Sequence, residues 1–286
     1  MAYNEPAPEA PEQFSYADEG KKWTYHLEGL IPIVLILIIA LFLTCRFGVI
    51  GSNIPVLSSV CGVLGGGAQP AQVLIIGEPS RNMRAVFDAD QDLVRYRVKT
   101  AESLERNPES QLAQYDIVIL DQSNQASKEV SRQLGDAIQK YVKTGGKLIT
   151  IRDSGIRRPD SPDVVGWTAT FGDVIPVDCT YIGILNQPSC TQRIVVRGRI
   201  FSQDTKHPIM QGFEQVPAEG VNTLLLLDAL DVTPNGKELA YMEDARTGKT
   251  YTAIVEKPLV VGKSLYFNYD PGDTPGLLEA TVKYLK

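Results

Sequence analysis

The chain has 286 residues, and 43% of them are hydrophobic, which is enough for one large domain or two small ones. The net charge is −6 and no long basic patch occurs, so nucleic acid is not an expected partner. Four cysteines and two histidines occur without a CxxC motif, and His26 and His207 lie far apart. We therefore predict neither a metal nor a cofactor.

Residues 1–27 form an arm rich in proline and acidic side chains, which we expect to be disordered. Residues 28–50 contain an uncharged run at 29–45, centred on IPIVLILIIALFL, and with Phe47, Val49 and Ile50 the segment reaches about 20 residues, enough to cross a bilayer. A secretory signal peptide is the competing interpretation, but it would lie nearer the start and be followed by a small-residue cleavage site. The pattern therefore predicts one transmembrane helix and a single-pass protein of the cell membrane.

Positive charges around this helix predict its orientation. Lys21 and Lys22 precede it, whereas Arg46 alone follows it. The positive-inside rule then places the large domain on the extracytoplasmic side. Residues 51–70 form an uncharged, glycine-rich linker, either a plain tether or a surface for lateral packing. The expected partners are the lipid bilayer and, through the span and linker, a membrane protein or a second copy of the chain.

Residues 71–286 are predicted to form one α/β domain, and its clearest unit runs from Tyr115 to Gly155. Continuous apolar runs at 117–120 and 148–151 indicate buried strands, because neither alternates with polar residues. Apolar residues between them recur with helical spacing, and Gly145-Gly146 ends that helix. Strands at 73–76 and 96–100, with a helix at 81–90, precede this unit.

These elements predict an open, mostly parallel sheet of flavodoxin-like or amidotransferase-like type, with helices on both faces. Beyond Gly155 the chain is loop-like, and later strands are expected at 193–200, 223–227, 252–255 and 264–268. Asn235-Gly236 is the stronger hairpin signal and Thr247-Gly248 the weaker one. The last helix is expected at 277–285.

Three acidic residues follow predicted strands: Glu78, Asp121 and Asp153. Ligands of open α/β sheets bind at this edge, so these residues, with Ser80 and Arg152, are the candidate ligand-binding set. Their carboxylates would suit a divalent cation or a general base. The alternative is that they are caps and turn formers. Their spacing matches no specific metal code, so no metal is predicted.

Candidate catalytic residues are Asp153, Ser154 and His207. His207 is the one histidine of residues 71–286, and Pro208 after it keeps it out of a helix interior. It is either an acid–base residue or a structural turn residue. Cys179 and Cys190 bracket a hairpin-like loop; they would form a disulfide in an oxidising compartment and stay free thiols otherwise.

Several segments, taken in order, resemble the class I glutamine amidotransferase-like fold, especially its trehalose-utilisation-like branch. They are VLIIG, YDIVIL, YVKTGGKLITI, HPIMQGF and the tail GKSLYFNYDPGDTPGLLEATVKYL. The resemblance covers the domain at 71–286. It implies a tight elbow after the second strand of the Tyr115–Gly155 unit, where active members of the family carry a cysteine nucleophile that a histidine activates.

The elbow departs from that pattern, since it reads Ile151-Arg152-Asp153-Ser154-Gly155 and no cysteine lies near it. An arginine stays protonated and cannot be a nucleophile. Ser154 lacks the Gly-x-Ser-x-Gly setting of a nucleophilic serine. Glutaminase activity is therefore not expected.

The main functional prediction is a membrane-anchored, non-catalytic, amidotransferase-like pseudoenzyme that binds a ligand or a partner protein. One alternative is an enzyme directed at a carbohydrate or envelope polymer, using the carboxylates at the strand ends. The other is a structural subunit of a membrane assembly.

Overall fold

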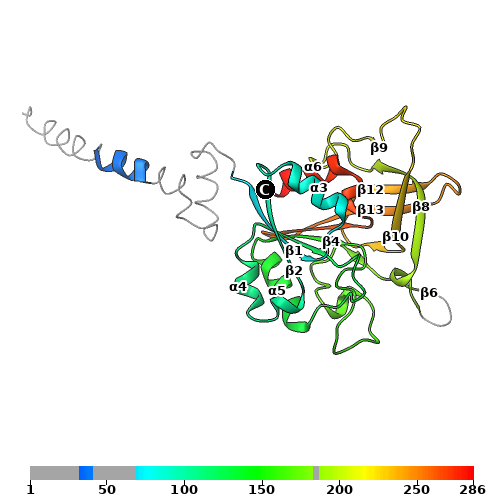
Figure 1. Ribbon diagram of the computed structural model, residues 1–286, viewed down its shortest axis with the longest axis horizontal. Helices are drawn as coiled ribbons and strands as arrows, with labels where there is room; N and C mark the ends of the chain where they lie inside the picture. The colour runs from blue at the N-terminus through cyan, green and yellow to red at the C-terminus, as the bar shows by residue number, and fades with distance from the viewer. Residues whose placement is uncertain (1–31, 41–68, 183–186) are drawn as a thin grey trace, which may run out of the picture. The chain divides into compact units, whose positions relative to one another are not determined.

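The computed structural model describes residues 32–40, 69–182 and 187–286 (Figure 1). Residues 32–40 are helical, and Gln69–Lys286 form a compact unit of their own. Within the described residues, no helix has both the length and the apolar character that a bilayer span needs. The predicted arm, most of the predicted span and most of the linker lie outside the described residues, so the membrane anchor stays a prediction.

Five strands form the parallel half of the central sheet, in the order β14-β4-β3-β1-β2. Their bounds are Ala71–Gly77 (β1), Val94–Lys99 (β2), Ile117–Asp121 (β3), Lys147–Ile151 (β4) and Lys263–Phe267 (β14). Every residue of β3 is buried, as expected for a parallel strand covered on both faces. The predicted strands of this half are confirmed.

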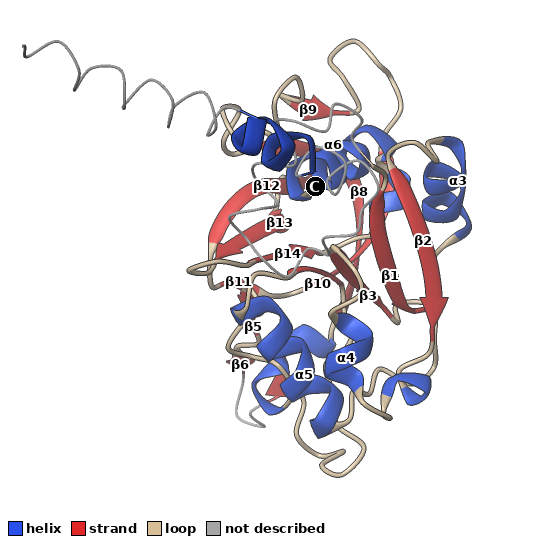
Figure 2. Cartoon of the chain, turned by 90° about the vertical axis from the view of Figure 1, so that its left-hand side faces the viewer, coloured by secondary structure: helices blue, strands red, loops and turns tan. Residues whose placement is uncertain are grey.

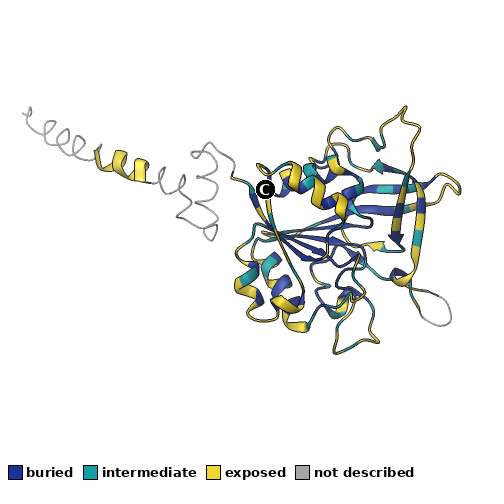
Figure 3. Ribbon diagram, in the orientation of Figure 1, coloured by how far each residue is buried: buried dark blue, intermediate teal, exposed yellow. Residues whose placement is uncertain are grey.

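Helices cover both faces of this half (Figure 2). On one face lie α3 (Arg81–Ala89) and α6 (Pro275–Leu285), which share a core cluster. On the other face lie α4 (Pro108–Leu112) and α5 (Arg132–Lys143), which belong to a second cluster. Figure 3 shows buried strands between helices whose outer surfaces are exposed. The predicted α/β class is therefore confirmed.

Four strands continue the sheet beyond β14 in antiparallel order, β13-β12-β8-β10. They are Arg193–Ser202 (β8), Leu225–Leu230 (β10), Lys237–Asp244 (β12) and Thr250–Pro258 (β13). A short strand, Gln215–Val216 (β9), pairs with β8. The sheet is therefore mixed. The sequence patterns predict strands in this region, but they do not predict that these strands extend the parallel sheet.

Two short pairs lie outside this sheet. Val177–Asp178 (β5) pairs with Thr233–Pro234 (β11), and Tyr181–Ile182 (β6) pairs with Gln187–Pro188 (β7). Single 3₁₀ turns lie at Glu102–Leu104, Trp167–Ala169, Ser189–Thr191 and Pro271–Asp273.

The two hairpin predictions have opposite outcomes. Asn235-Gly236 separates β11 from β12, but β11 pairs with β5, so the predicted hairpin there is wrong. Thr247-Gly248 lies between β12 and β13, which do pair. Gly248 has φ +67°, a backbone conformation that glycine adopts without a steric cost.

Candidate functional site

The carboxyl ends of β1, β3 and β4 meet at one edge of the sheet. Gly77 lies in register with Asp121, and the Glu78 amide donates to the Asp121 carbonyl at 2.7 Å. The Arg152 amide in turn donates to the Phe267 carbonyl of β14 at 2.8 Å. The candidate residues predicted from the sequence therefore do follow neighbouring strands, as the ligand rule for open α/β sheets requires.

Asp121 is the buried carboxyl of this edge, with 1% of its surface exposed. Its Oδ1 accepts hydrogen bonds from the Ser123 hydroxyl at 2.6 Å and the Ser123 amide at 3.1 Å. Desolvation outweighs these bonds and raises the pKa of Asp121 to about 6. Asp121 does not line the cavity that Asp153 lines.

Glu78 and Ser80 contribute less than the sequence suggests. The Ser80 hydroxyl accepts from the Met83 amide at 3.0 Å, which makes it the N-cap of α3. Glu78 is exposed, and its carbonyl accepts from the Asn124 side-chain amide at 3.4 Å. Neither residue lines the cavity. Their capping and turn roles are the alternative that the sequence leaves open.

Arg152 occupies the elbow directly after β4. Its φ is +50°, in the left-handed region that non-glycine residues rarely adopt. Its side chain is 7% exposed, and Nη1 lies 3.8 Å from the Asp228 carboxylate of β10. Nε and Nη2 are buried and have no hydrogen-bond partner among the described residues. Buried guanidinium donors without partners are rare and mark an unusual polar environment.

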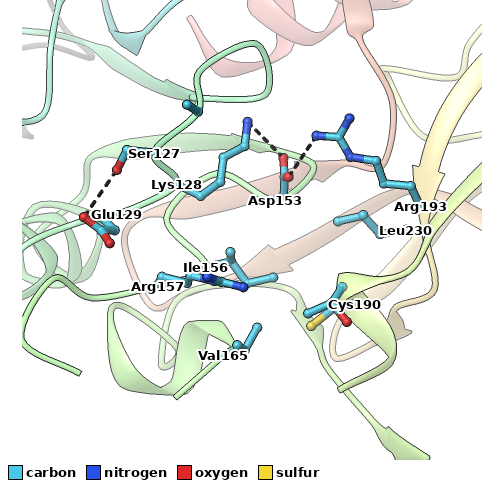
Figure 4. Close-up of a pocket in the computed structure, with 12 residues that line it drawn as sticks. Ser127, Lys128, Glu129, Asp153, Ile156, Arg157, Val165, Cys190, Arg193 and Leu230 are labelled. Atoms are coloured by element: carbon cyan, nitrogen blue, oxygen red, sulfur yellow. Dashed lines mark hydrogen bonds and ion pairs between the residues drawn. The ribbon is translucent and has the colours of Figure 1, made fainter. Parts of the chain in front are cut away.

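Asp153, the next residue, lines a cavity of about 530 Å³ (Figure 4). Its carboxylate lies between two cations: Lys128 Nζ is 3.7 Å from Oδ1, and Arg193 Nη2 is 3.6 Å from Oδ2. Both distances exceed that of a hydrogen bond, and within the described part of the chain Oδ1 is buried without one. The carboxylate is therefore held by charge, and its Oδ1 has unused capacity to accept a hydrogen bond.

Lys128 reaches the cavity from the loop after β3. Its side chain is 11% exposed, and Nζ donates to the Gln122 carbonyl. Burial lowers its pKa, while the charge of Asp153 raises it and those of Arg193 and Arg152 lower it further. Lys128 thus links the end of β3 with the elbow of β4.

Glu129 is the second carboxylate that lines the cavity. Figure 4 shows Lys128 between it and Asp153. Glu129 Oε2 accepts from the Ser127 hydroxyl at 3.3 Å, and its backbone forms a parallel bridge with Arg157, another lining residue. One cavity therefore contains two carboxylates in different charge environments.

Ser154 is buried, and its hydroxyl forms a hydrogen bond with the backbone. Its hydroxyl accepts from the Gln122 amide at 2.7 Å, and its carbonyl accepts from Trp167 Nε1 at 2.9 Å. The Gln122 side chain accepts from the Gly155 amide at 2.9 Å, which closes a contact between the two strand-end turns. Because Ser154 does not line the cavity, its geometry offers no support for a nucleophilic role.

His207 lies in a different environment from Asp153. Its Nε2 is 3.1 Å from Glu256 of β13, and the Tyr284 hydroxyl donates to the same carboxylate at 2.7 Å. The Ile209 amide donates to His207 Nδ1 at 3.3 Å, and the imidazole packs edge-on against the Tyr284 ring. His207 is buried, and both ring nitrogens have partners. This arrangement fits the structural interpretation of the His-Pro turn.

A disulfide forms part of the cavity wall. Cys179 and Cys190 are joined, with their Cα atoms 5.2 Å apart, and Cys190 is a lining residue. Gly166, with φ +124°, passes close to this bridge: a Cβ there would lie 3.5 Å from Cys179 Sγ.

Four charged lining residues have no site role in the sequence analysis: Lys128, Glu129, Arg157 and Arg193. They come from two loops and from β8, and the sequence does not show that these segments meet. The available signal was the charged pair Lys128-Glu129 just before Ser131, the N-cap of α5. Among the described residues, no group of three His, Cys, Asp or Glu side chains could hold a metal ion.

Comparison with known proteins adds information on the fold. No family model and no curated protein matches the chain. Among solved structures, a β-galactosidase from Bacillus circulans sp. alkalophilus is 14% identical with a TM-score of 0.50, over 80% of this chain and 34% of that one. A carbohydrate deacetylase is 12% identical with a TM-score of 0.37, over 71% of this chain and 30% of that one.

A putative GMP synthase subunit from Thermoplasma acidophilum is also similar, at 6% identity and a TM-score of 0.40, over 76% of this chain and 96% of that one. The chain spans about a third of the length of the β-galactosidases that it matches. Similarity at these identities concerns the fold. No family model supports the finer assignment to the trehalose-utilisation-like branch.

The main functional prediction needs a correction. A non-catalytic amidotransferase-like binding module was expected, but the similar structures are mostly named as carbohydrate-directed enzymes. The missing cysteine excludes glutaminase chemistry at the elbow and says nothing of other reactions. The prediction placed first is therefore withdrawn, and the carbohydrate-directed alternative becomes a proposal.

Proposed function

We propose that this chain is a carbohydrate-directed hydrolase whose active site is the cavity beside the elbow of β4. The observation that carries the proposal is the presence of two carboxylates, Glu129 and Asp153, in the lining of one cavity. Hydrolysis of a glycosidic bond commonly uses two carboxyl groups, one as the acid and one as the base or nucleophile.

The surroundings of the two carboxylates suit different roles. Asp153 lies between Lys128 and Arg193, a setting that suits the group that must carry negative charge during the reaction. Within the described residues, Glu129 has only the Ser127 hydroxyl as its side-chain partner, and it is assigned as the proton donor to the leaving oxygen. Two carboxyls in unlike environments are the usual basis for dividing acid and base roles.

The cavity also has a suitable size and lining. Ligand pockets typically measure roughly 300–1,000 Å³, and this one is about 530 Å³. Its lining combines these charged groups with the apolar side chains of Ile156, Val165 and Leu230. A sugar ring presents hydroxyls at its rim and C–H groups on its faces, so it would complement such a wall.

The disulfide supports an extracytoplasmic location for the proposed enzyme, because such bonds persist in oxidising compartments. This agrees with the orientation predicted from Lys21, Lys22 and Arg46. A substrate outside the cell, such as an envelope or environmental polysaccharide, follows from that location. The membrane anchor and its lateral partners belong to the same proposal.

The test is hydrolysis by the purified full chain, measured as reducing ends released from a panel of neutral and acidic polysaccharides. Asp153→Asn keeps the shape of the side chain but removes its charge, and it should abolish the release. Asp92→Asn is the matched control, because Asp92 is exposed just before β2, at the opposite end of the strands. No release from any member of the panel, or equal release by Asp153→Asn, would refute the proposal.

A further inference from the structure

The cavity carries more positive charge than its carboxylates neutralise. Three cations line it, Lys128, Arg157 and Arg193, against two carboxylates, Glu129 and Asp153. A site for a neutral sugar has no need of this excess. The excess positive charge therefore indicates a substrate that carries negative charge.

Arg193 is the first cation with unused donors. It extends from the start of β8, its side chain is 57% exposed, and its closest approach to Asp153 is 3.6 Å. A guanidinium carries five N–H donors in a planar fork. At this distance the fork is attracted to Asp153 but is not hydrogen-bonded to it, so its donors remain available to a ligand.

Arg157 is the second cation of the cavity wall with unused hydrogen-bond donors. Its backbone is fixed, because its amide donates to the Lys128 carbonyl at 3.3 Å and its carbonyl accepts from the Val130 amide at 2.9 Å. Among the described residues, its guanidinium has no ion pair. A fixed backbone with an unpaired guanidinium at a cavity wall is suited to bind an anion.

Arg152 does not line the cavity, but its charge adds to the positive potential there. It directly precedes Asp153, is more than nine-tenths buried, and leaves Nε and Nη2 without hydrogen-bond partners in the described part of the chain. In that same part, Asp228, at 3.8 Å, is its one ion-pair partner and is half exposed. Because a buried charge is screened less than an exposed one, Arg152 makes the cavity more attractive to an anion.

From these contacts we infer that the cavity binds an acidic saccharide, with the carboxylate of a hexuronic acid unit held by Arg157 and Arg193. This inference rests on the proposed function, because it names the substrate class of the same cavity. The planar arginine fork matches a carboxylate with two parallel hydrogen bonds. The sugar ring then lies against the wall that contains Asp153 and Glu129.

Binding is tested apart from turnover with the wild-type full chain and two sulfur-linked disaccharides, which resist hydrolysis. One is digalacturonate and the other is its neutral counterpart, digalactose. By calorimetry we expect digalacturonate to bind at least roughly tenfold more tightly, as bonds to a charged group imply. Arg157→Gln and Arg193→Gln should each remove most of that preference.

Arg95→Gln is the matched control, since Arg95 is exposed on β2 at the far edge of the sheet, and it should keep the preference. Equal affinity for the two disaccharides, binding of neither, or a preference that survives both arginine variants would overturn the inference. Asp153-dependent hydrolysis of a neutral polysaccharide alone would overturn the inference and leave the hydrolase proposal intact. Selective binding of digalacturonate without hydrolysis of any polymer would support the inference on binding and refute the hydrolase proposal.

Discussion

The Asn268 side chain pairs with both backbone groups of Leu230. The Leu230 amide donates to Asn268 Oδ1 at 2.9 Å, and Asn268 Nδ2 donates to the Leu230 carbonyl at 2.9 Å. This two-point contact fixes the end of β10 to the residue that follows β14. Leu230 lines the cavity, so the buried Asn268 side chain, which follows a strand of the parallel half, fixes a part of the cavity wall that comes from the antiparallel half.

Replacing this amide should destabilise the fold and distort the cavity. In Asn268→Asp, the Nδ2 donor is lost, and an acceptor then faces the carbonyls of Leu230 and Thr252. A buried group that loses its partner costs about 1–3 kcal/mol, so we expect a loss of at least about 2 kcal/mol in the free energy of unfolding. Urea unfolding at pH 7 measures this. Asn124→Asp, at an exposed site, should change stability by less than about 0.5 kcal/mol, and an equal loss in both variants would contradict the account.

Asp121 should give the protein a distinctive pH dependence. Its pKa is about 6 in the folded chain and near 3.8 when the chain is unfolded. Between these values the folded state binds more protons, so this group makes the free energy of unfolding fall as the pH rises. Two pH units correspond to roughly 3 kcal/mol. The folded protein has this contribution to its free energy of unfolding at low pH and loses it as the pH rises through 6.

Asp121→Asn should therefore be less stable than the wild type, or equal to it, at pH 4, and more stable at pH 7.5. The amide can still accept from Ser123 through Oδ1 and carries no charge to desolvate. Urea unfolding of both proteins at the two pH values gives the comparison. A stability difference that is independent of pH would show that the Asp121 pKa is not raised.

Gly77 should tolerate no side chain. It has φ +122°, and a Cβ there would lie 1.9 Å from the Asp121 carbonyl oxygen. Gly77→Ala should thus force β1 and β3 apart at the edge that carries the site, with a loss above about 3 kcal/mol in stability. Gly212→Ala is the control: φ is +85°, but a Cβ would meet nothing within 4 Å. Gly212→Ala should lose only about 1 kcal/mol in the free energy of unfolding, which is the cost of the backbone conformation alone. Thermal unfolding measures both variants. Similar unfolding curves for the two would contradict the steric clash at Gly77.

The Cys179–Cys190 disulfide should stabilise the domain by about 3 kcal/mol. It links positions 11 residues apart, and the chain-entropy model assigns about this value to a loop of that length. A Cys179→Ser, Cys190→Ser double variant should unfold at a correspondingly lower urea concentration. Adding a reductant should shift the wild type toward this variant and leave the variant unchanged. A reductant effect on both proteins would point to another cause.

Sequence patterns could predict the parallel half because its strands are buried on both faces. The runs that became β3 and β4 are continuous and apolar, and α5 shows helical spacing between a serine cap and Gly145. The antiparallel half was harder to predict. Strand β8 has one exposed face and a mixed sequence pattern, and nothing local in it shows that its neighbours are β10 and β12.

The candidate site was predictable only in part, for a similar reason. The strand-end rule selected Asp121, Arg152 and Asp153, since each lies at the end of a recognisable strand, and of these three Asp153 lines the cavity. Arg193 reaches Asp153 from 40 positions later in the chain, and Glu129 lies in a loop without a motif. Long-range pairing of this kind leaves no local trace. For His207 the sequence left a catalytic and a structural role open, and the partners of both ring nitrogens could be known only from the structure.

The most direct test of the central claim is the turnover number of the full chain on whichever polysaccharide of the panel it hydrolyses best, for wild type and Asp153→Asn at equal concentration. The variant keeps the size of the side chain beside Lys128 and Arg193 and loses the charge that the reaction needs. We predict a fall of roughly a hundredfold or more, as expected for the loss of a group that acts in proton transfer or as nucleophile. Unchanged turnover in Asp153→Asn, with the protein still folded, would contradict the assignment of this cavity as the active site.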